Sequence, residues 1–449
     1  VIVSGGTGIF TGLLPFVWFT NQPSNSGLYQ NMVEYNTQKN PGSLPADFGF
    51  NPNYRETLQK YPSLFPSTPS EQAPDVIAYV DPKFKMPQVW RSNLNVDIQL
   101  PYDFMLSVGA MYTRDIYNVA QINMNEAEPT GVYNEQPDRI YWASKKYEYN
   151  DYTNGKNVVV KLSNGEDKGY QYSFNAILTK KYDFGFTGSI GYTYTMAKDL
   201  TANPGSAPNS AWQNNVAVNS LNDPGVSYSL FSTPHRIIAN ASYEINYAKC
   251  LKTTFSLFYS GYHTGRYSYT YYNDMNGDGN YSDLIYVPNS QDEMTFVDIT
   301  DKSGAITYSA VDQAKDFWDF VNNDSYLKDR KGKYVERNGS LTPWINRFDF
   351  KIAQDFYATL GGRKYGIQVS LDMLNVGNMI NSKWGAYQSC GLKSYDNVQL
   401  LKTASKVGEP LTYQINANSR EAFKERSSWQ YTNTIGSAWS MQLGVKVTF

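Results

Sequence analysis

The segment WSMQLGVKVTF, residues 439–449, ends the chain with a strict two-residue hydrophobic period. Apolar residues alternate with polar or small ones, so one face of an extended strand is apolar along its whole length. The same alternation recurs in four other segments, with apolar residues at Phe348, Phe350 and Ile352; at Ile367, Val369 and Leu371; at Phe104, Leu106 and Val108; and at Tyr172, Phe174 and Ala176. The period therefore predicts an all-β protein built from long strands.

About ten strands are predicted from this alternation, and short turns join them at one end. Their ranges are 5–19, 88–100, 102–120, 168–181, 184–198, 235–247, 251–265, 346–358, 364–378 and 438–449. The other ends carry long connections rich in Asn, Asp, Gly, Ser, Pro and Tyr, at residues 20–86, 122–167, 200–233, 266–343 and 380–436. A short helix with one apolar face is expected inside one connection, at Val311–Tyr326.

Short turns at one end and long loops at the other are typical of a transmembrane antiparallel β-barrel, with turns in the periplasm and extracellular loops. A strand of about ten residues, tilted by about 40°, rises roughly 25 Å, which is the height of the apolar band of such barrels. A soluble β-sandwich or propeller also has alternating strands, but these usually run about 5–6 residues. The length of the predicted strands favours the membrane barrel.

The composition excludes several other classes of protein. The chain has 449 residues, and no run approaches the roughly 18 apolar residues that a membrane-spanning helix needs. Its 38 Tyr, 22 Phe and 9 Trp are more aromatic residues than a disordered chain carries. Lys plus Arg is 39 and Asp plus Glu is 41, and the net charge of −2 gives no electrostatic basis for nucleic-acid binding.

Phe449, an aromatic residue at the end of an alternating strand, resembles the assembly signal of bacterial outer-membrane proteins. Further stretches resemble the C-terminal barrel of TonB-dependent transporters, specifically the Oar-like group of the Bacteroidetes. These stretches are Gly8–Trp18, Thr233–Ala239, Asp274–Asn280, Asp283–Pro288, Asn338-Gly339, Pro343–Asp349 and Asp372–Asn378. Their order and spacing are similar to those of the family over nearly the whole chain.

The resemblance implies a 22-stranded barrel, a plug domain that fills it and a periplasmic segment that contacts the TonB–ExbB–ExbD system. About ten strands cannot close such a barrel, and residues 1–449 contain no recognisable plug. We therefore expect one partial barrel domain, the C-terminal portion of a longer protein in the outer membrane of a Gram-negative bacterium. The missing strands would lie in the rest of that protein or in a second chain. Unpartnered strands leave two edges, so an arc is expected instead of a closed ring.

The same resemblance implies a receptor whose extracellular loops capture a substrate, which is then imported through the plugged barrel. No bond chemistry is expected, so the protein is not expected to be an enzyme. Two other functions stay open. An adhesin or receptor would bind without importing, and a barrel enzyme would need a Ser–His–carboxylate or paired-carboxylate site in its loops. The loops suit a peptide, a glycan or a protein equally.

One loop has the residue pattern of a calcium site. Oxygen ligands at positions 1, 3 and 5 and a glycine at position 6 match the first half of a calcium loop. Position 12 is Ile285 where Glu is usual, and Asp283 could substitute for it. The predicted calcium ligands are Asp274, Asn276, Asp278, Asn280 and Asp283. The alternative is a solvated Asp–Gly turn, and no other cofactor is expected.

The two histidines and two cysteines give little support for a transition-metal or disulfide site. His235 and His263 lie near the loop ends of neighbouring strands, and without a supporting carboxylate or Cys they are expected to be hydrogen-bonded rim residues. Cys250 and Cys390 fall at opposite ends of the strands. Their separation would exceed the roughly 7 Å between Cα atoms that a disulfide allows, so two free thiols are expected.

Polar and aromatic residues outside these motifs have two possible roles each. Inward-facing polar residues would line the lumen and either contact the plug or solvate the interior: Arg91, Asn93, Asp97, Asp349, Lys351, Asp355 and Asp372. Aromatic loop residues would either stack on a ligand or pack the loops together: Tyr267, Tyr269, Tyr271, Tyr272, Trp318 and Trp344. The glycine-rich residues 5–12 lack the spacing and the following helix of a dinucleotide loop, and that interpretation is rejected.

Overall fold

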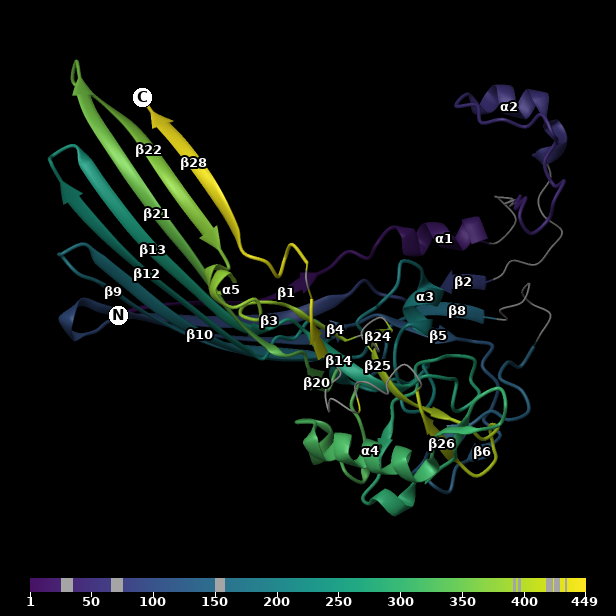
Figure 1. Ribbon diagram of the computed structural model, residues 1–449. Coiled ribbons are helices and arrows are strands. Elements are labelled where there is room, and N and C mark those ends of the chain that lie inside the picture. The colour runs from purple at the N-terminus through teal and green to yellow at the C-terminus, as the bar shows by residue number, and fades with distance from the viewer. Residues whose placement is uncertain are drawn as a thin grey trace.

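The computed structural model describes residues 1–25, 35–65, 76–149, 158–390, 393–394, 397–416, 423, 429–432 and 434–449. Parts of the predicted loops 20–86, 122–167 and 380–436 therefore lie outside the described residues. Long strands form one curved sheet, and the long connections between them gather at one end of it (Figure 1). We call the described residues of these connections, within 12–87, 118–169, 200–234, 264–343 and 375–439, the loop domain.

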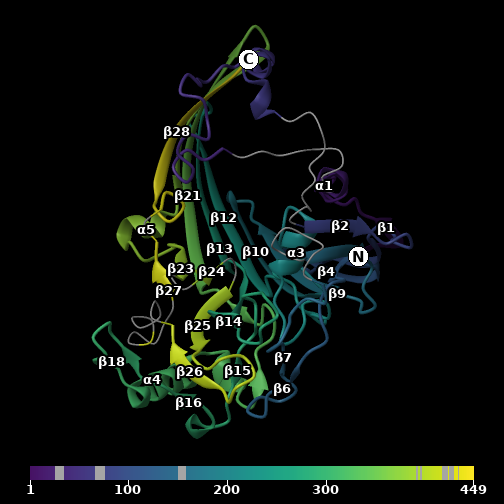
Figure 2. The same ribbon diagram turned by 90° about the vertical axis from the view of Figure 1, so that its right-hand side faces the viewer.

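The large sheet is antiparallel throughout, in the order β1-β3-β4-β9-β10-β12-β13-β21-β22-β28. Its strands are β1 Ile2–Thr11, β3 Gln88–Gln99, β4 Phe104–Tyr117, β9 Tyr170–Lys181, β10 Phe186–Asp199, β12 His235–Tyr247, β13 Leu251–His263, β21 Trp344–Leu360, β22 Arg363–Leu374 and β28 Ser440–Thr448, with β11 Ser227–Tyr228 beside β10. Among the residues described, β1 pairs only with β3 and β28 only with β22. The sheet is thus an open arc, as the sequence predicts (Figure 2).

The first predicted strand, 5–19, is wrong at its C-terminal end. The strand stops at Thr11, and helix α1 (Val17–Asn25) follows. Pro15 has no N–H to donate to a ladder, and its carbonyl instead accepts the N–H of Trp18 at 3.0 Å. Trp18 is drawn into a buried cluster of the loop domain, so tertiary packing outweighs the local alternation.

One further predicted strand ends earlier than expected, and the predicted helix is present. The predicted strand 364–378 ends at Leu374, because Asn375 adopts a positive φ of 51° and begins helix α5 (Val376–Ile380). The predicted helix in the fourth long connection is confirmed as α4 (Ala310–Asn323). Ser309 caps it by accepting the N–H of Asp312 at 3.1 Å.

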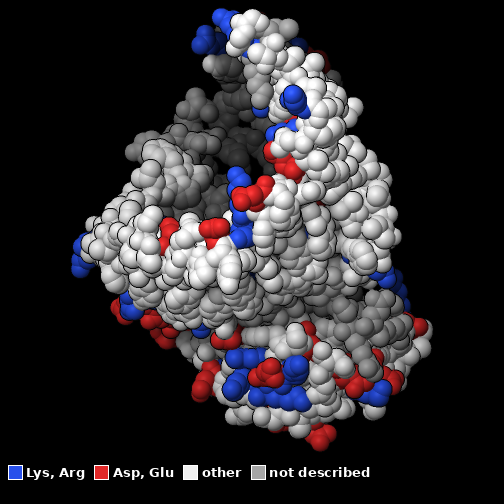
Figure 3. Space-filling model, turned by 90° about the vertical axis from the view of Figure 1, so that its left-hand side faces the viewer, with Lys and Arg blue, Asp and Glu red and all other residues white. Residues whose placement is uncertain are grey.

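No described residue covers the apolar face of the large sheet. Leu443 is 72% exposed and Val445 67% exposed. Apolar residues oppose each other across the strands, with Leu371 paired to Leu443 and Val369 paired to Val445. Because no second layer packs here, this face is available to lipid hydrocarbon. Figure 3 shows many charged residues over the lower part of the molecule, where the loop domain lies, and others along the hollowed inner side of the arc, with few on the outer surface of the strands.

The opposite face of the sheet is polar, and its charged residues pair with one another. Lys351 lies 2.8 Å from Asp372 on the neighbouring strand. The hydroxyl of Ser107 donates to Asp97 at 2.5 Å. All seven residues predicted to line the lumen lie on these strands. Besides the Lys351–Asp372 pair, Arg91 donates to Thr113, Asp349 lies 3.6 Å from Arg347, and Asp355 lies 3.7 Å from Lys252.

The hairpin turns lie at one end of the sheet and the loop domain at the other. The β12–β13 turn has positive φ at Ala248 and Lys249, and the β21–β22 turn has positive φ at Gly361 and Gly362. Consecutive positive φ values produce the primed turns whose twist matches that of the flanking strands. These short turns leave all five long connections on the same end.

The loop domain contains several small sheets and helices. The three-stranded sheet has β2 Val76–Val80, β8 Val158–Ser163 and β5 Ala120–Asn123. The six-stranded sheet has β16 Thr295–Phe296, β26 Thr412–Ile415, β25 Asn397–Thr403, β14 Arg266–Tyr271, β20 Ser340–Leu341 and β24 Lys393–Ser394. Four pairs are β6 Gly131–Val132 with β7 Ile140–Tyr141, β15 Tyr286–Val287 with β19 Lys333–Tyr334, β17 Ile299–Thr300 with β18 Ile306–Tyr308, and β23 Gln388–Cys390 with β27 Trp429–Tyr431. The remaining helices of the loop domain are α2 Tyr54–Lys60 and α3 Pro208–Gln213, with 3₁₀ turns η1 Pro62–Leu64, η3 Gln291–Glu293 and η4 Leu327–Asp329. The 3₁₀ turn η2 Pro101–Asp103 lies in the β3–β4 hairpin at the other end of the sheet.

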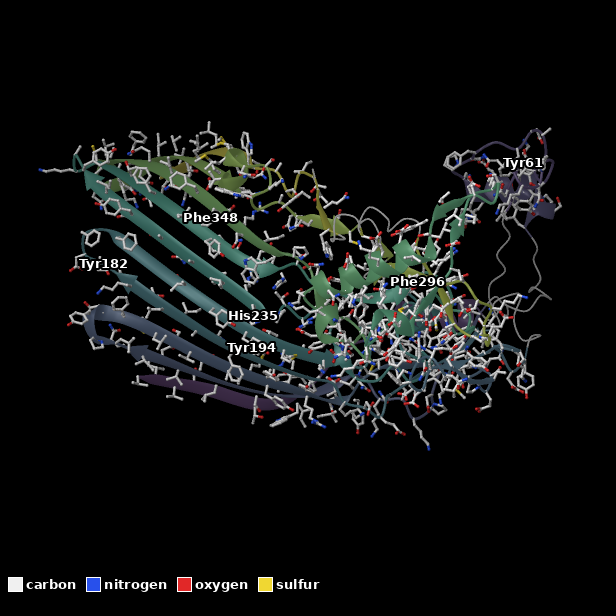
Figure 4. All side chains as sticks on the ribbon, turned by 60° about the horizontal axis from the view of Figure 1, so that its bottom comes forward. Tyr61, Tyr182, Tyr194, His235, Phe296 and Phe348 are labelled. Carbon is white, nitrogen blue, oxygen red and sulfur yellow. The ribbon has the colours of Figure 1, made fainter. Side chains whose placement is uncertain are left out.

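The hydrophobic core lies in the loop domain. Tyr269, Phe317, Phe320 and Leu400 are almost fully buried in one cluster that joins β14, α4 and β25. Figure 4 shows the corresponding density of side chains around Phe296, in contrast to the single layer of strands. No helix in the described ranges has both the length and the apolar character needed to cross a membrane.

Because only one face of the strands is apolar, a charged substitution should have different effects on the two faces. Leu443→Arg is expected to cost about 2–4 kcal/mol, because a lipid-facing arginine near the bilayer midplane is poorly solvated. The amount of heat-modifiable, folded full-length protein in outer-membrane fractions should fall accordingly. Gln442→Arg, one residue earlier on the polar face and opposite Asp372, is the control and should assemble normally. Equal assembly of both variants would contradict a lipid-facing role for Leu443.

Candidate functional site

A cavity of about 740 Å³ opens in the loop domain. Its described lining residues come from α3, from the segment after β14 and from β25: Gln213, Asn214, Tyr272, Asn273, Gly279, Asn280, Tyr281, Ser282, Asn397 and Gln399. Six of these carry side-chain amides and two are tyrosines. None of the described lining residues is charged, so the described part of the cavity wall is polar and neutral.

The Asp–Gly turn predicted to bind calcium forms one wall of this cavity. The Asp274 carboxylate accepts the N–H of Gly277 at 2.7 Å and that of Gly279 at 2.9 Å. Further along the turn, Asp278 accepts the N–H of Asn280 at 2.7 Å. Side chains of the turn therefore satisfy its own backbone and hold Asn280 and the next residues at the cavity.

Asp283, the last predicted ligand, has two partners. One oxygen accepts the N–H of Met275 at 3.1 Å, and the other lies 3.5 Å from the guanidinium of Arg139. Arg139 is fully buried and also donates to the carbonyls of Val218 and Leu284. This arginine joins three long connections of the loop domain. No period or motif marks Arg139, so the sequence does not predict its role.

Burial changes the acidity of the carboxyl groups in this turn. Burial raises the pKa of Asp278 well above its usual value, and the nearby Asp283 and Asp274 carboxylates raise it further. Burial also raises the pKa of Asp283 to about 7, although Arg139 opposes the rise. The pKa of Asp274 is raised by burial, against the N–H groups of Gly279 and Gly277. Three carboxyl groups thus share a poorly solvated site.

The predicted calcium ligands lie close together in sequence and in the same turn. In the part of the chain that the structure describes, no group of three or more His, Cys, Asp or Glu side chains is arranged to hold a metal. The turn does contain two buried amide nitrogens without a hydrogen-bond partner, those of Asn276 and Asn280. Calcium binding at this turn stays a prediction.

Only one of the four predicted tyrosines near β14 reaches the cavity. Tyr267, Tyr269 and Tyr271 are buried, because β14 has β20 on one side and β25 on the other and lies in the core. The hydroxyl of Tyr269 donates to Asp324 at 2.7 Å, which satisfies it inside the core. These three residues pack the loops together. Tyr272, the first residue beyond β14, is 47% exposed and lines the cavity.

The two predicted tryptophans lie elsewhere. Trp318 on α4 packs against the core, and the Lys331 ammonium lies 4.5 Å from the centre of its ring. Trp344 begins β21 and lines a separate cavity of about 340 Å³. Its ring lies 5.0 Å from that of His263, edge to face. Neither tryptophan contributes to the amide-lined cavity.

Both histidines are hydrogen-bonded near the loop domain, as predicted. His235 bonds to the hydroxyl of Tyr192 at 2.7 Å, and His263 donates to the carbonyl of Thr342 at 2.5 Å. His235 and the nearby Tyr194 lie where the strands enter the loop domain (Figure 4). No disulfide joins the two cysteines: Cys250 lies in an exposed hairpin turn, and Cys390 is buried in the loop domain.

The backbone of the Asp–Gly turn predicts a sensitive position. Gly277 has a φ of +82°, and a Cβ there would lie 2.6 Å from the carbonyl oxygen of Trp142. Gly277→Ala should therefore lower the stability of the loop domain by more than the roughly 1 kcal/mol that a positive φ alone costs a residue with a side chain. Thermal unfolding followed by tryptophan fluorescence measures the change.

Gly304 supplies the matched control for this substitution. It has a similar φ of +85°, but a Cβ there meets nothing within 4 Å. Gly304→Ala should thus carry only the backbone cost. If the two alanine variants unfold at the same temperature, close packing of the turn against Trp142 is not what constrains Gly277.

Comparison with known proteins gives two findings. The family model described as "Outer membrane beta barrel domain" matches residues 1–385 of the chain. Among solved structures, the chain is similar to the outer membrane transporter YddB from Escherichia coli, with 12% identity and a TM-score of 0.34. That match covers 69% of this chain and 31% of YddB, so the chain spans about a third of the transporter's length. No curated protein sequence matches the chain.

Proposed function

Because the chain belongs to the outer membrane β-barrel domain family, we propose that it is the C-terminal barrel portion of a TonB-dependent importer of the Oar-like, Bacteroidetes type. The observation that carries the proposal is the open arc. Among the described residues, the outer edges of β1 and β28 have no strand partner. Unpaired backbone N–H and C=O groups are not tolerated in hydrocarbon. Further strands, from the rest of a 22-stranded barrel or from a second chain, would pair with these edges.

The two faces of the arc support an importer. The uncovered apolar face suits lipid, and the face that carries Lys351 and Asp372 suits a water-filled lumen closed by a plug. In this mechanism, the loop domain lies outside the cell and captures the substrate. Energy transmitted through the TonB–ExbB–ExbD system then displaces the plug. The chain performs no bond chemistry, and both of its histidines are held by Tyr192 and Thr342.

Capture by TonB tests the importer against an adhesin or receptor. The full-length protein, purified from outer membranes, is expected to be retained by an immobilised periplasmic domain of TonB from the same organism. A version lacking its periplasmic TonB-contact segment is the control and should not be retained. An adhesin would stay on the cell surface and bind its ligand without any contact to TonB. Failure of the full-length protein to bind TonB would reject active import.

Calcium in the Asp274–Asp283 turn is a further part of the proposal. The donors Asp274, Asn276, Asp278, Asn280 and Asp283 offer oxygen atoms, which suit a hard cation. The carboxyl groups of Asp278 and Asp283 are buried there and that of Asp274 is half-buried, with the fully buried Arg139 beside Asp283. A divalent cation would offset the remaining negative charge and stabilise this wall of the loop domain.

Removal of calcium tests this part separately. Addition of a chelator to the full-length protein should lower the unfolding temperature of the loop domain, and millimolar calcium should restore it. Asp278→Asn should abolish the response, because it removes a buried charged ligand. Asp301→Asn changes a turn carboxylate that is exposed and accepts the N–H groups of Ser303 and Ala305, so this control should keep the response. If the chelator does not change the unfolding temperature of the wild-type loop domain, the calcium site is rejected.

A further inference from the structure

We propose that the amide-lined cavity of the loop domain binds a neutral oligosaccharide. This inference rests on the proposed function, since it names the substrate class that the loops would capture. The cavity volume of about 740 Å³ lies within the range of ligand sites, about 300–1,000 Å³. The cavity is therefore large enough for an organic ligand, and not only for an ion or a few water molecules.

The chemistry of the wall matches hydroxyl groups. A side-chain amide offers two donors and a carbonyl acceptor, and a sugar hydroxyl both donates and accepts. Gln213 and Asn214 come from the end of α3, and Asn397 and Gln399 come from β25, so amides face the cavity from two separate elements. Such a wall can bond vicinal hydroxyls without requiring charge on the ligand.

Part of this wall is already oriented by the protein. The amide of Asn273 donates to the hydroxyl of Thr403 at 2.8 Å and accepts the N–H of Thr403 at 3.0 Å. The amide of Asn214 donates to the carbonyl of Pro204 at 2.9 Å. These bonds fix two of the lining side chains, which reduces the ordering cost of binding a ligand.

One amide is buried without a partner in the wall. Asn280 is 5% exposed, and its amide nitrogen has no hydrogen-bond partner. A buried donor without an acceptor costs free energy. A ligand hydroxyl that accepts from this amide would remove that cost. The unpartnered donor is thus the feature of the wall that itself indicates a ligand.

Two tyrosines supply the apolar part of the site. Tyr272 is 47% exposed and Tyr281 is 66% exposed, and both lie at the cavity. Aromatic rings with polar tips suit ligands that present both C–H faces and hydroxyls. None of the described lining residues has an aliphatic side chain. A peptide would need apolar pockets for its anchoring side chains, so the lining favours a glycan over a peptide.

Binding of defined oligosaccharides tests the inference. The full-length protein, in a detergent without a sugar headgroup, is titrated calorimetrically with maltohexaose, cellohexaose and mannohexaose. Oligogalacturonate and a tryptic digest of casein serve as the acidic and the peptide probes. At least one neutral hexasaccharide is expected to bind, with weaker or no binding of the other two probes. Binding of the peptides alone, of the acidic sugar alone, or of no probe would overturn the proposal.

Variants locate the binding in this cavity. Tyr281→Ala should weaken binding of the neutral hexasaccharide by about 2- to 10-fold, the size expected for one aromatic contact. Tyr54→Ala, on α2 and similarly exposed at 64%, is the matched control and should bind normally. Asn280→Ala should weaken binding in calcium-free buffer, where its role as a predicted calcium ligand does not contribute, because it removes an unpartnered donor. Unchanged binding in both the Tyr281 and Asn280 variants would place the glycan elsewhere and refute the site.

The two proposals fail in different ways. Retention by TonB without hexasaccharide binding would leave the importer in place and reject the glycan cavity. Binding of a hexasaccharide without retention by TonB would keep the cavity and make the protein a glycan receptor without active import.

Discussion

The continuous hydrogen-bonded ladder across the long strands is the constraint on which the rest of the molecule depends. Inside a bilayer, each backbone N–H and C=O group must find a partner in the protein. Side chains alternate between faces, so the register of the ladder also decides which residues meet lipid. With Leu371 opposite Leu443 and Lys351 opposite Asp372, one register keeps the apolar face continuous and the charges paired on the other face.

The same ladder explains where the core is found. Antiparallel strands joined by short turns at one end bring every long connection to the other end. Five such connections meet there, and their apolar residues bury each other instead of the sheet. Arg139 strengthens this arrangement, because it bonds to Asp283 and to the carbonyls of Val218 and Leu284. A buried arginine with such partners is costly to remove, since Asp283 would lose its counter-charge and the two carbonyls would lose their donor.

The cavity follows from how these connections meet. The chain leaves the buried strand β14 at Tyr272, turns tightly at Gly277 and Gly279, and re-enters the core at Leu284. Positive φ at the two glycines lets Asp274 accept N–H groups from within the turn. Residues 279–282 therefore stand at the edge of the core, facing amides from α3 and β25. A rigid wall made by polar residues is well suited to selecting ligands by hydrogen bonding.

The sequence by itself determined the long strands, their hairpin turns and helix α4, because alternation, turn residues and caps are local properties of the chain. It also marked the Asp–Gly turn. Tertiary structure alone decided that Trp18 lies in helix α1 and packs into a buried cluster, that Tyr267, Tyr269 and Tyr271 are buried, and that Arg139 contacts Asp283. Arg139 and Asp283 are 144 residues apart, and the cavity amides come from three connections. Such contacts depend on how loops pack around a common core, and no period or spacing within one segment records that packing.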